Sequence, residues 1–179
     1  MLEREIKLRF DSADLARQQV LSLAATPLRG RRLQQDSLLD TESQQLLERG
    51  SALRVRRENG ESLLTFKGPV QPGAMKLREE VETRVADGAV LMTILGALGL
   101  HVWFRYEKYR EEFSADNIVI AIDETPIGVF VEIEGSEEHI RGAAEALGRT
   151  SHDFVTASYR SLYLEHCRGR GLQPTDMLF

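Results

Sequence analysis

Apolar and charged side chains alternate along residues 2–10, at the start of the chain. An alternation with a period of two residues is typical of a β-strand that buries one face. We therefore predict a strand whose apolar side is interrupted only by Arg4. The opposite side of this strand carries Glu3, Glu5, Lys7 and Arg9.

Similar patterns along the rest of the chain bring the expected number of strands to about eight. The further strands are expected at residues 32–39, 51–58, 61–67, 75–85, 101–113, 117–124 and 129–135. Asn59-Gly60 separates two of them and supplies the positive φ angles that a two-residue hairpin turn requires. Strands that follow one another through short connections favour an antiparallel sheet in an α+β protein.

Helices are expected between some of the strands and after the last one. Ser12, Asp87 and Ser136 precede helical segments and are suitable N-cap residues. The expected helical segments are residues 12–24, 41–49, 87–98, 136–147 and 156–166.

Length and composition indicate one globular domain over residues 1–179, because 42% hydrophobic residues in a chain of this length can form a core. There is no apolar run long enough for a membrane span and no signal-peptide core, so we expect a cytoplasmic protein without a membrane partner. The net charge of −5 argues against a nucleic-acid partner. Residues 168–179 are expected either to form a flexible tail or to dock on the sheet or on a second subunit, as in a homodimer.

The polar faces of the predicted strands carry like charges side by side. Residues at i and i+2 of a strand point the same way, roughly 6–7 Å apart. A solvated sheet face also carries charge, but repeated like-charge neighbours repel and are not favoured by stability alone. The pairs are Glu3/Glu5, Glu80/Glu82, Glu132/Glu134, Arg54/Arg56 and Lys108/Arg110, and Lys67, Arg78 and Asp123 belong to the same faces.

A sheet of eight twisted strands tends to curl, and closing it removes its edges. If the charged faces turn inward, the closed sheet encloses a wet, charged channel and packs its apolar faces against the helices. Clustered carboxylates suit Mg²⁺ or Mn²⁺, whereas converging Arg and Lys side chains suit phosphate oxygens. A complex of a divalent metal with a polyphosphate matches both kinds of charge.

The charged motifs resemble those of the CYTH superfamily, the triphosphate tunnel metalloenzymes. Glu3-Arg4-Glu5-Ile6-Lys7 is similar to the ExExK signature of that family. The similarity covers nearly the whole chain and continues in order through 53–56, 64–68, 78–82, 107–110, 122–124, 128–134 and Ser158-Tyr159.

The resemblance implies an eight-stranded antiparallel β-barrel with flanking helices and a triphosphate tunnel inside. It implies that Mg²⁺ or Mn²⁺ is held by Glu3, Glu5, Glu132 and Glu134. It implies that the triphosphate is bound by Lys7, Arg54, Arg56, Lys67, Arg78, Lys108 and Arg110. The catalytic residues it implies are Lys7, Glu80, Glu82 and Asp123. Several members carry Lys or Arg just before the Ser-Tyr pair; Ala157 stands there in this chain, and Arg160 is a candidate replacement.

These residues favour metal-dependent hydrolysis of a phosphoanhydride in an inorganic, nucleoside or thiamine triphosphate. A class IV adenylyl cyclase, which converts ATP to cAMP and pyrophosphate, is the main alternative because the same phosphate contacts could serve it. A non-catalytic module that binds polyphosphate or nucleotide is a hypothesis from another class, and a scaffold with a merely solvated charged face is a third. The intact acidic pairs favour an enzyme. The four histidines lack the spacing of metal ligands, and no Walker A loop precedes Lys67.

Overall fold

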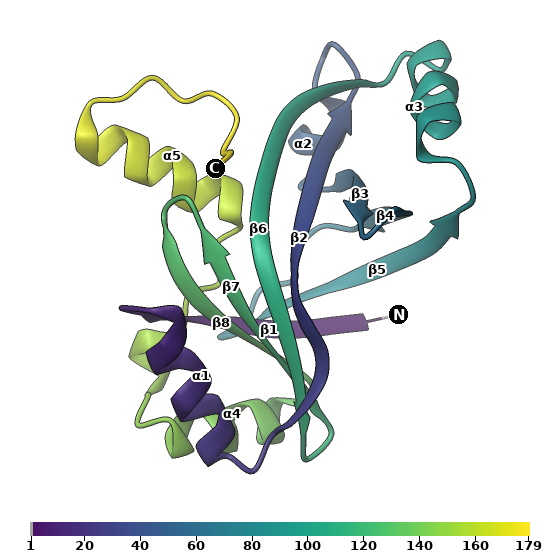
Figure 1. Cartoon of the computed structure of the whole chain (residues 1–179). Coiled ribbons are helices and arrows are strands. Elements are labelled where there is room, and N and C mark those ends of the chain that lie inside the picture. Colours follow the sequence, from purple (N-terminus) through teal and green to yellow (C-terminus); the bar gives the residue numbers. More distant parts are fainter. Residues whose placement is uncertain (1) are drawn as a thin grey trace.

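The computed structural model describes residues 2–179 and shows a closed barrel of eight antiparallel strands (Figure 1). Around the barrel the strand order is β1-β5-β4-β3-β2-β6-β7-β8. The predicted α+β class and antiparallel barrel with flanking helices are therefore confirmed. The strands are β1 (Leu2–Phe10), β2 (Thr26–Asp40), β3 (Ala52–Glu58), β4 (Glu61–Lys67), β5 (Lys76–Val85), β6 (His101–Ala115), β7 (Ile118–Thr125) and β8 (Gly128–Glu134). The helices are α1 (Ala13–Ser22), α2 (Gln45–Glu48), α3 (Gly88–Ala97), α4 (Glu137–Ala146) and α5 (Tyr159–Arg170), with a 3₁₀ turn at Ser151–Asp153.

The largest hydrophobic core lies outside the barrel, where β1, β7 and β8 meet α1 and α4. Each fully buried Ile or Leu contributes about 1.5–3 kcal/mol. Because this core forms on the outer face, the inner face of the same strands is left for charged side chains. The core includes Ile6, Leu8, Ile120, Ile122, Val131 and Ile133 from the strands, with Ala16, Val20, Ile140 and Ala144 from the helices.

The predicted caps and hairpin turn are confirmed. The side chains of Ser12, Asp87 and Ser136 accept backbone N–H groups in the first turns of α1, α3 and α4. Asn59 and Gly60 have φ angles of 49° and 81° between β3 and β4. These local signals fix where the strands stop and therefore which side chains face inward.

The predicted strand at residues 32–39 was too short. The observed β2 begins at Thr26 and pairs with β6 through register shifts between Pro27 and Arg29 and between Arg29 and Arg32. Such bulges accommodate residues that interrupt a regular ladder. A segment with the sequence of a loop can therefore form part of a strand here. Arg31, in the basic stretch Arg29-Gly30-Arg31-Arg32, binds Glu124 at 2.6 Å, so this stretch is anchored by an ion pair.

Two predicted helices are shorter at their starts. The carboxylate of Asp40 accepts the N–H groups of Leu46 and Leu47, and α2 is confined to Gln45–Glu48. The last helix begins at Tyr159 rather than at residue 156, because Ser158 is extended and its hydroxyl caps the helix.

The C-terminal segment docks on the barrel. Met177 is buried, its N–H donates to the carbonyl of Arg105, and its carbonyl accepts the N–H of Glu107, both at 2.9 Å. This part of β6 lies beyond the residues that pair with β7. The tail thus extends the sheet where β7 has ended, and α5 lies beside it (Figure 1).

Candidate functional site

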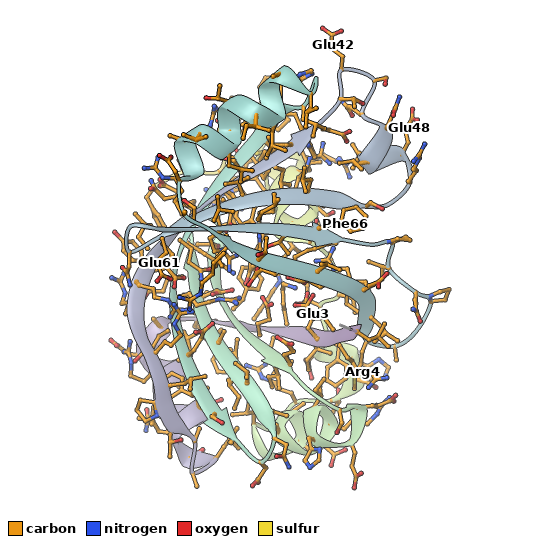
Figure 2. The ribbon with its side chains drawn as sticks, turned by 90° about the vertical axis from the view of Figure 1, so that its right-hand side faces the viewer. Glu3, Arg4, Glu42, Glu48, Glu61 and Phe66 are labelled. Carbon is orange, nitrogen blue, oxygen red and sulfur yellow. The ribbon has the colours of Figure 1, made fainter. Side chains whose placement is uncertain are left out.

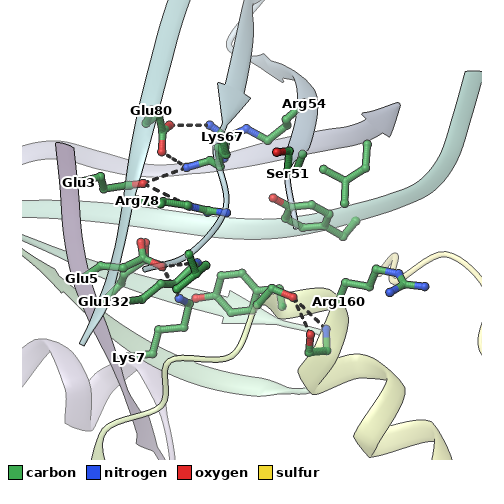
Figure 3. Close-up of a pocket in the computed structure, with 18 of the residues that line it drawn as sticks. Glu3, Glu5, Lys7, Ser51, Arg54, Lys67, Arg78, Glu80, Glu132 and Arg160 are labelled. Carbon is green, nitrogen blue, oxygen red and sulfur yellow. Dashed lines mark hydrogen bonds and ion pairs between the residues drawn. The ribbon is translucent and has the colours of Figure 1, made fainter. Parts of the chain in front are cut away.

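The barrel encloses a cavity of about 440 Å³ that is lined by charged side chains (Figure 3). Six carboxylates and nine cationic side chains line it, a formal excess of three positive charges in a chain whose net charge is −5. The carboxylates are those of Glu3, Glu5, Glu80, Glu82, Glu132 and Glu134. The cations are Lys7, Arg54, Arg56, Lys67, Lys76, Arg78, Lys108, Arg110 and Arg160. All predicted site residues except Asp123 are therefore among the lining residues.

The alternation of the strands produces this convergence. Figure 2 shows Glu3 inside the ring of strands, whereas Phe66 on β4 points outward. In β3, Arg54 and Arg56 are buried while the next residue, Arg57, is exposed. Residues far apart in the sequence meet because each strand turns every second residue toward one interior.

On the cationic side, Asp36 holds Arg54 and Arg56 in place. Arg56 donates to the two carboxylate oxygens of Asp36 at 2.9 and 3.1 Å, and the Nε of Arg54 lies 3.5 Å away. Burial would raise the pKa of Asp36, but the two guanidinium groups outweigh it and lower the pKa. The pair of arginines is therefore preorganised by a buried anion behind it.

Asp123 plays a similar part on β7. Its carboxylate accepts hydrogen bonds from Lys108 at 2.8 Å, from Arg110 at 2.6–2.7 Å and from the hydroxyl of Tyr159 at 2.6 Å. Burial opposes ionisation, yet Arg110 and Lys108 hold the pKa of Asp123 far below its usual value. Asp123 lies behind the cavity wall and orients two cations; its predicted catalytic role remains a prediction.

Lys7 lies between two of the carboxylates that the sequence predicts as metal ligands. Its Nζ is 2.8 Å from Glu5 and 3.9 Å from Glu132, and Lys76 approaches Glu5 at 2.6 Å. Burial would lower the pKa of Lys7, but Glu5 and Glu132 raise it. Lys7 is therefore charged at any working pH. Arg110 also reaches Glu132, at 3.0 Å.

A second group of ion pairs links β1, β4 and β5. Lys67 binds Glu3 at 3.2 Å and also contacts Glu80 (Figure 3). The hydroxyl of Thr65 donates to Glu82 at 2.7 Å, and Arg54 reaches Glu82 at 3.3 Å. Arg78 completes this wall, with its Nε 3.8 Å from Glu3.

Glu134 lies at a part of the cavity where carboxylates are crowded together. Burial, followed by the neighbouring charges of Glu3, Glu132, Glu5 and Glu80, raises its pKa to about 7. In the register of β1 and β8, Glu5 lies opposite Glu134. Carboxylates that gather at one place repel one another, and a hard divalent cation would relieve this repulsion.

These carboxylates are chemically suitable ligands for a divalent metal, but they are not arranged as a metal site. Among residues 2–179 no three His, Cys, Asp or Glu side chains are arranged as a ready metal site. Glu5 and Glu132 are engaged by lysine and arginine side chains instead. A metal would have to displace some of these ion pairs, and Glu3, Glu5, Glu132 and Glu134 are the residues that would hold it.

Sequence reasoning missed two of the charged groups at the site. One is Asp36, which alternates with Arg32 and Gln34 on the inner face of β2. Lys76 lies two positions before Arg78 on the inward face of β5 and is the second. The same period-two pattern that identified the other residues could have identified both.

The fold and the cavity define a class of protein, an antiparallel barrel with an apolar exterior and a charged interior. This chain belongs to the CYTH family, since the CYTH domain model matches residues 1–159. A protein of Methanocaldococcus jannaschii that is provisionally named an adenylate cyclase is 30% identical over 137 residues, which cover 76% of this chain and 78% of the relative.

Solved structures repeat the barrel. A Vibrio parahaemolyticus protein, also provisionally named an adenylate cyclase, has a TM-score of 0.79 at 20% identity over 90% of this chain and 97% of its own. A Hippeastrum adenylyl cyclase candidate, reported to have a dominant triphosphatase activity, has a TM-score of 0.69 at 19% identity over 92% and 96%. At these identities the likeness establishes the fold. The described helices include none long and apolar enough to cross a membrane.

Proposed function

We propose that the protein is a metal-dependent enzyme that binds a triphosphate inside the barrel and hydrolyses one of its phosphoanhydride bonds. The observation that carries this proposal is the convergence of nine cations and six carboxylates on one cavity. Phosphoryl transfer depends chiefly on positioning and on neutralising charge, and this lining is suited to both.

Cations from two strands would bind the phosphate groups. Arg54 and Arg56 present their guanidinium groups from β3, and each can bind phosphate oxygens in a fork. From β6, Arg110 presents a third guanidinium group, and Lys108 adds an ammonium group that binds a phosphate oxygen as a point charge. Their buried partners Asp36 and Asp123 keep them oriented before the ligand arrives, so little reorganisation is needed on binding.

The carboxylates of Glu3, Glu5, Glu132 and Glu134 would hold Mg²⁺ or Mn²⁺. The metal would polarise phosphate oxygens and supply a water of lowered pKa. Lys7 lies between Glu5 and Glu132 and can bind a phosphate oxygen next to the metal ligands. Glu80 and Glu82, the other two carboxylates of the cavity lining, would orient the attacking water by accepting its hydrogen bonds.

Adenylyl cyclase activity is the second candidate, because the relative that is 30% identical carries that provisional name. In that reaction the ribose 3′-hydroxyl attacks the innermost phosphorus, and pyrophosphate leaves. The two activities use the same phosphate contacts and differ in which phosphorus faces the nucleophile. Their products separate them.

A product assay tests the proposal. The purified protein is incubated with tripolyphosphate, ATP or thiamine triphosphate, with Mg²⁺ or Mn²⁺ and with or without a chelator. We expect metal-dependent phosphate release that Glu132→Gln and Glu134→Gln abolish. Cyclic AMP with pyrophosphate, instead of phosphate, would identify a cyclase, and activity that persists in chelator would contradict the metal requirement.

A matched pair of variants tests the cationic wall, which is the part of the cavity lining formed by Arg54, Arg56, Lys108 and Arg110. Arg56 faces the cavity and Arg57, the next residue of β3, faces solvent. Arg56→Ala should weaken tripolyphosphate binding by about 1.5–3 kcal/mol, the usual value of a charged hydrogen bond. Arg57→Ala should leave the calorimetric affinity unchanged; equal effects of the two variants would place the anion outside the barrel.

A further inference from the structure

Tyr159 is an aromatic residue of the cavity lining and the first residue of α5. Its backbone is held in place because the hydroxyl of Ser158 caps the helix and accepts the N–H of Ser161 at 3.1 Å. The side chain of Tyr159 is enclosed: the residue is 7% exposed, and the edge of its ring meets Phe130 with 5.4 Å between the ring centroids. The fold therefore fixes which groups the ring and the hydroxyl of Tyr159 contact.

Two ammonium groups from different strands lie against this ring. The Nζ of Lys108 on β6 is 4.8 Å from the ring centroid, and the Nζ of Lys7 on β1 is 5.4 Å from it. Both distances are within the roughly 6 Å at which an aromatic face attracts a cation. Lys7 and Lys108 are 2% and 3% exposed, so bulk water does not screen this attraction, and it is strongest under that condition.

The hydroxyl of Tyr159 contacts the anion that accompanies one of these lysines. It donates to the carboxylate of Asp123 at 2.6 Å, and the same oxygen accepts Lys108 at 2.8 Å. Burial, followed by the negative charge of Asp123, raises the pKa of Tyr159 well above its usual value, so the hydroxyl stays protonated and remains a donor. Tyr159 thus holds Lys108 directly with its ring and indirectly through Asp123.

The ring leaves the N–H donors of both lysines available. An ammonium group has three N–H donors. Within residues 2–179, Lys7 donates one hydrogen bond, to Glu5, and Lys108 donates one, to Asp123. An aromatic face attracts the charge of an ammonium group without requiring one of its donors, whereas an aliphatic side chain in this place would not attract it at all.

We infer that Tyr159 is a positioning residue that holds the ammonium groups of Lys7 and Lys108 against its ring, so that their remaining donors can bind a phosphate group in the cavity. This inference rests on the proposed function, because a phosphate has to enter the cavity to meet the two lysines. Lys7 lies on the strand that carries Glu3 and Glu5, whereas Lys108 belongs to the cationic wall. The ring therefore links the part of the lining that would hold the metal to the part that would bind the phosphates.

Two substitutions separate the ring from the hydroxyl. Tyr159→Leu removes both, and Tyr159→Phe removes only the hydroxyl. Calorimetry at neutral pH without metal measures the dissociation constant of tripolyphosphate for each protein. Tyr159→Leu should raise this constant about 5–150-fold, because the ligand would then have to order two mobile lysine side chains. Tyr159→Phe should keep most of the affinity.

Tyr163→Leu is the matched control on the same helix. Tyr163 packs against the same aromatic cluster, with 6.0 Å between its ring centroid and that of Phe104, but it does not line the cavity. Its replacement should leave the dissociation constant unchanged, and thermal unfolding checks that each variant is folded. An unchanged constant in Tyr159→Leu would overturn the inference, and so would equal losses in Tyr159→Leu and Tyr163→Leu.

A double-mutant cycle distinguishes positioning from support of the fold. Lys108→Met removes the charge and should weaken tripolyphosphate binding less in the Tyr159→Leu background than in the wild type, because the lysine is already misplaced there. Residues that act independently give additive changes. Additive changes in this cycle would therefore overturn the inference.

Failure of the proposed function has a different signature. If the wild type binds no tripolyphosphate, the proposed function is refuted, and NMR of the free protein still tests the positioning of the lysines. The ring current should shift the ε-methylene protons of Lys7 and Lys108 upfield in the wild type and in Tyr159→Phe but not in Tyr159→Leu. Equal shifts in all three proteins would refute the positioning. If tripolyphosphate is hydrolysed while Tyr159→Leu binds it as the wild type does, the proposed function stands and the role of Tyr159 does not.

Discussion

Asp123→Asn isolates the contribution of the anion behind the cavity. The substitution keeps the shape of the side chain but removes the charge that compensates Lys108 and Arg110, both buried. Removing one partner of a buried ion pair costs about 3–5 kcal/mol because the other charge is left uncompensated. A domain of this length loses about 2–4 °C of Tm per kcal/mol, so the expected decrease is about 6–20 °C.

The contribution of Asp123 to the free energy of unfolding depends on pH. Because Lys108 and Arg110 hold the pKa of Asp123 far below that of an unfolded chain, its stabilising effect is fully present above the unfolded pKa of about 3.9 and is lost only as the pH falls through the folded value. At neutral pH the wild-type protein therefore has the full effect. Thermal unfolding at neutral pH measures the difference between the two proteins.

Tripolyphosphate should partly rescue the variant. A ligand that binds only the folded state stabilises it in proportion to the logarithm of its affinity, and an anion should bind more tightly where two cations have lost their internal partner. We expect a larger ligand-induced Tm shift for Asp123→Asn than for the wild type. Asp14→Asn, with a side chain that is 97% exposed on α1, is the control and should change neither value. An unchanged Tm for Asp123→Asn, or a smaller ligand shift, would refute the account of the cationic wall.

Two further predictions concern a titrating lysine and the tail. Burial, and then the neighbouring charge of Arg110, lowers the pKa of Lys108 to about 8, so metal-free tripolyphosphate binding should weaken as the pH rises through that value. The pKa of Lys76, which lines the same cavity, is also lowered to about 8, chiefly by burial. Lys108→Arg keeps the charge and should therefore reduce this inflection in calorimetric titrations, whereas a flat wild-type profile would contradict the prediction. Met177→Ala should cost about 2–5 kcal/mol in urea unfolding, because Met177 is buried against β6. The neighbouring Leu178→Ala, 44% exposed, should cost about 0.5 kcal/mol or less, and equal effects would argue against docking of the tail.

The barrel and most of its charged lining could be predicted from sequence because both follow from a period of two. Once Glu3, Glu5 and Lys7 are known to share a face, their burial depends only on which way the sheet curls. The apolar faces of the same strands settle this, because they need a cover and the amphipathic helices provide it. Like-charge neighbours on several strands therefore indicate a shared, enclosed interior, which a single charged strand does not.

The parts that could not be predicted depend on irregular backbone or on contacts between distant segments. The first half of β2 contains Pro27 and Gly30, which resemble loop residues and are accommodated by bulges. The apolar residues of the cavity lining come from a short helix, a loop and barrel strands. Leu47 and Val70 therefore share no pattern along the chain with Trp103. Whether the tail docks depends on a free stretch of β6, which exists only because β7 is the shorter strand.

The most direct test of the central claim is a crystal structure of the protein with tripolyphosphate and Mn²⁺. We expect phosphate density between the arginine pair of β3 and the cations of β6, at Arg54, Arg56, Lys108 and Arg110. We also expect an anomalous Mn²⁺ peak against carboxylates of Glu3, Glu5, Glu132 and Glu134. Tripolyphosphate bound only on the outer surface, with the interior ion pairs unchanged, would contradict the claim.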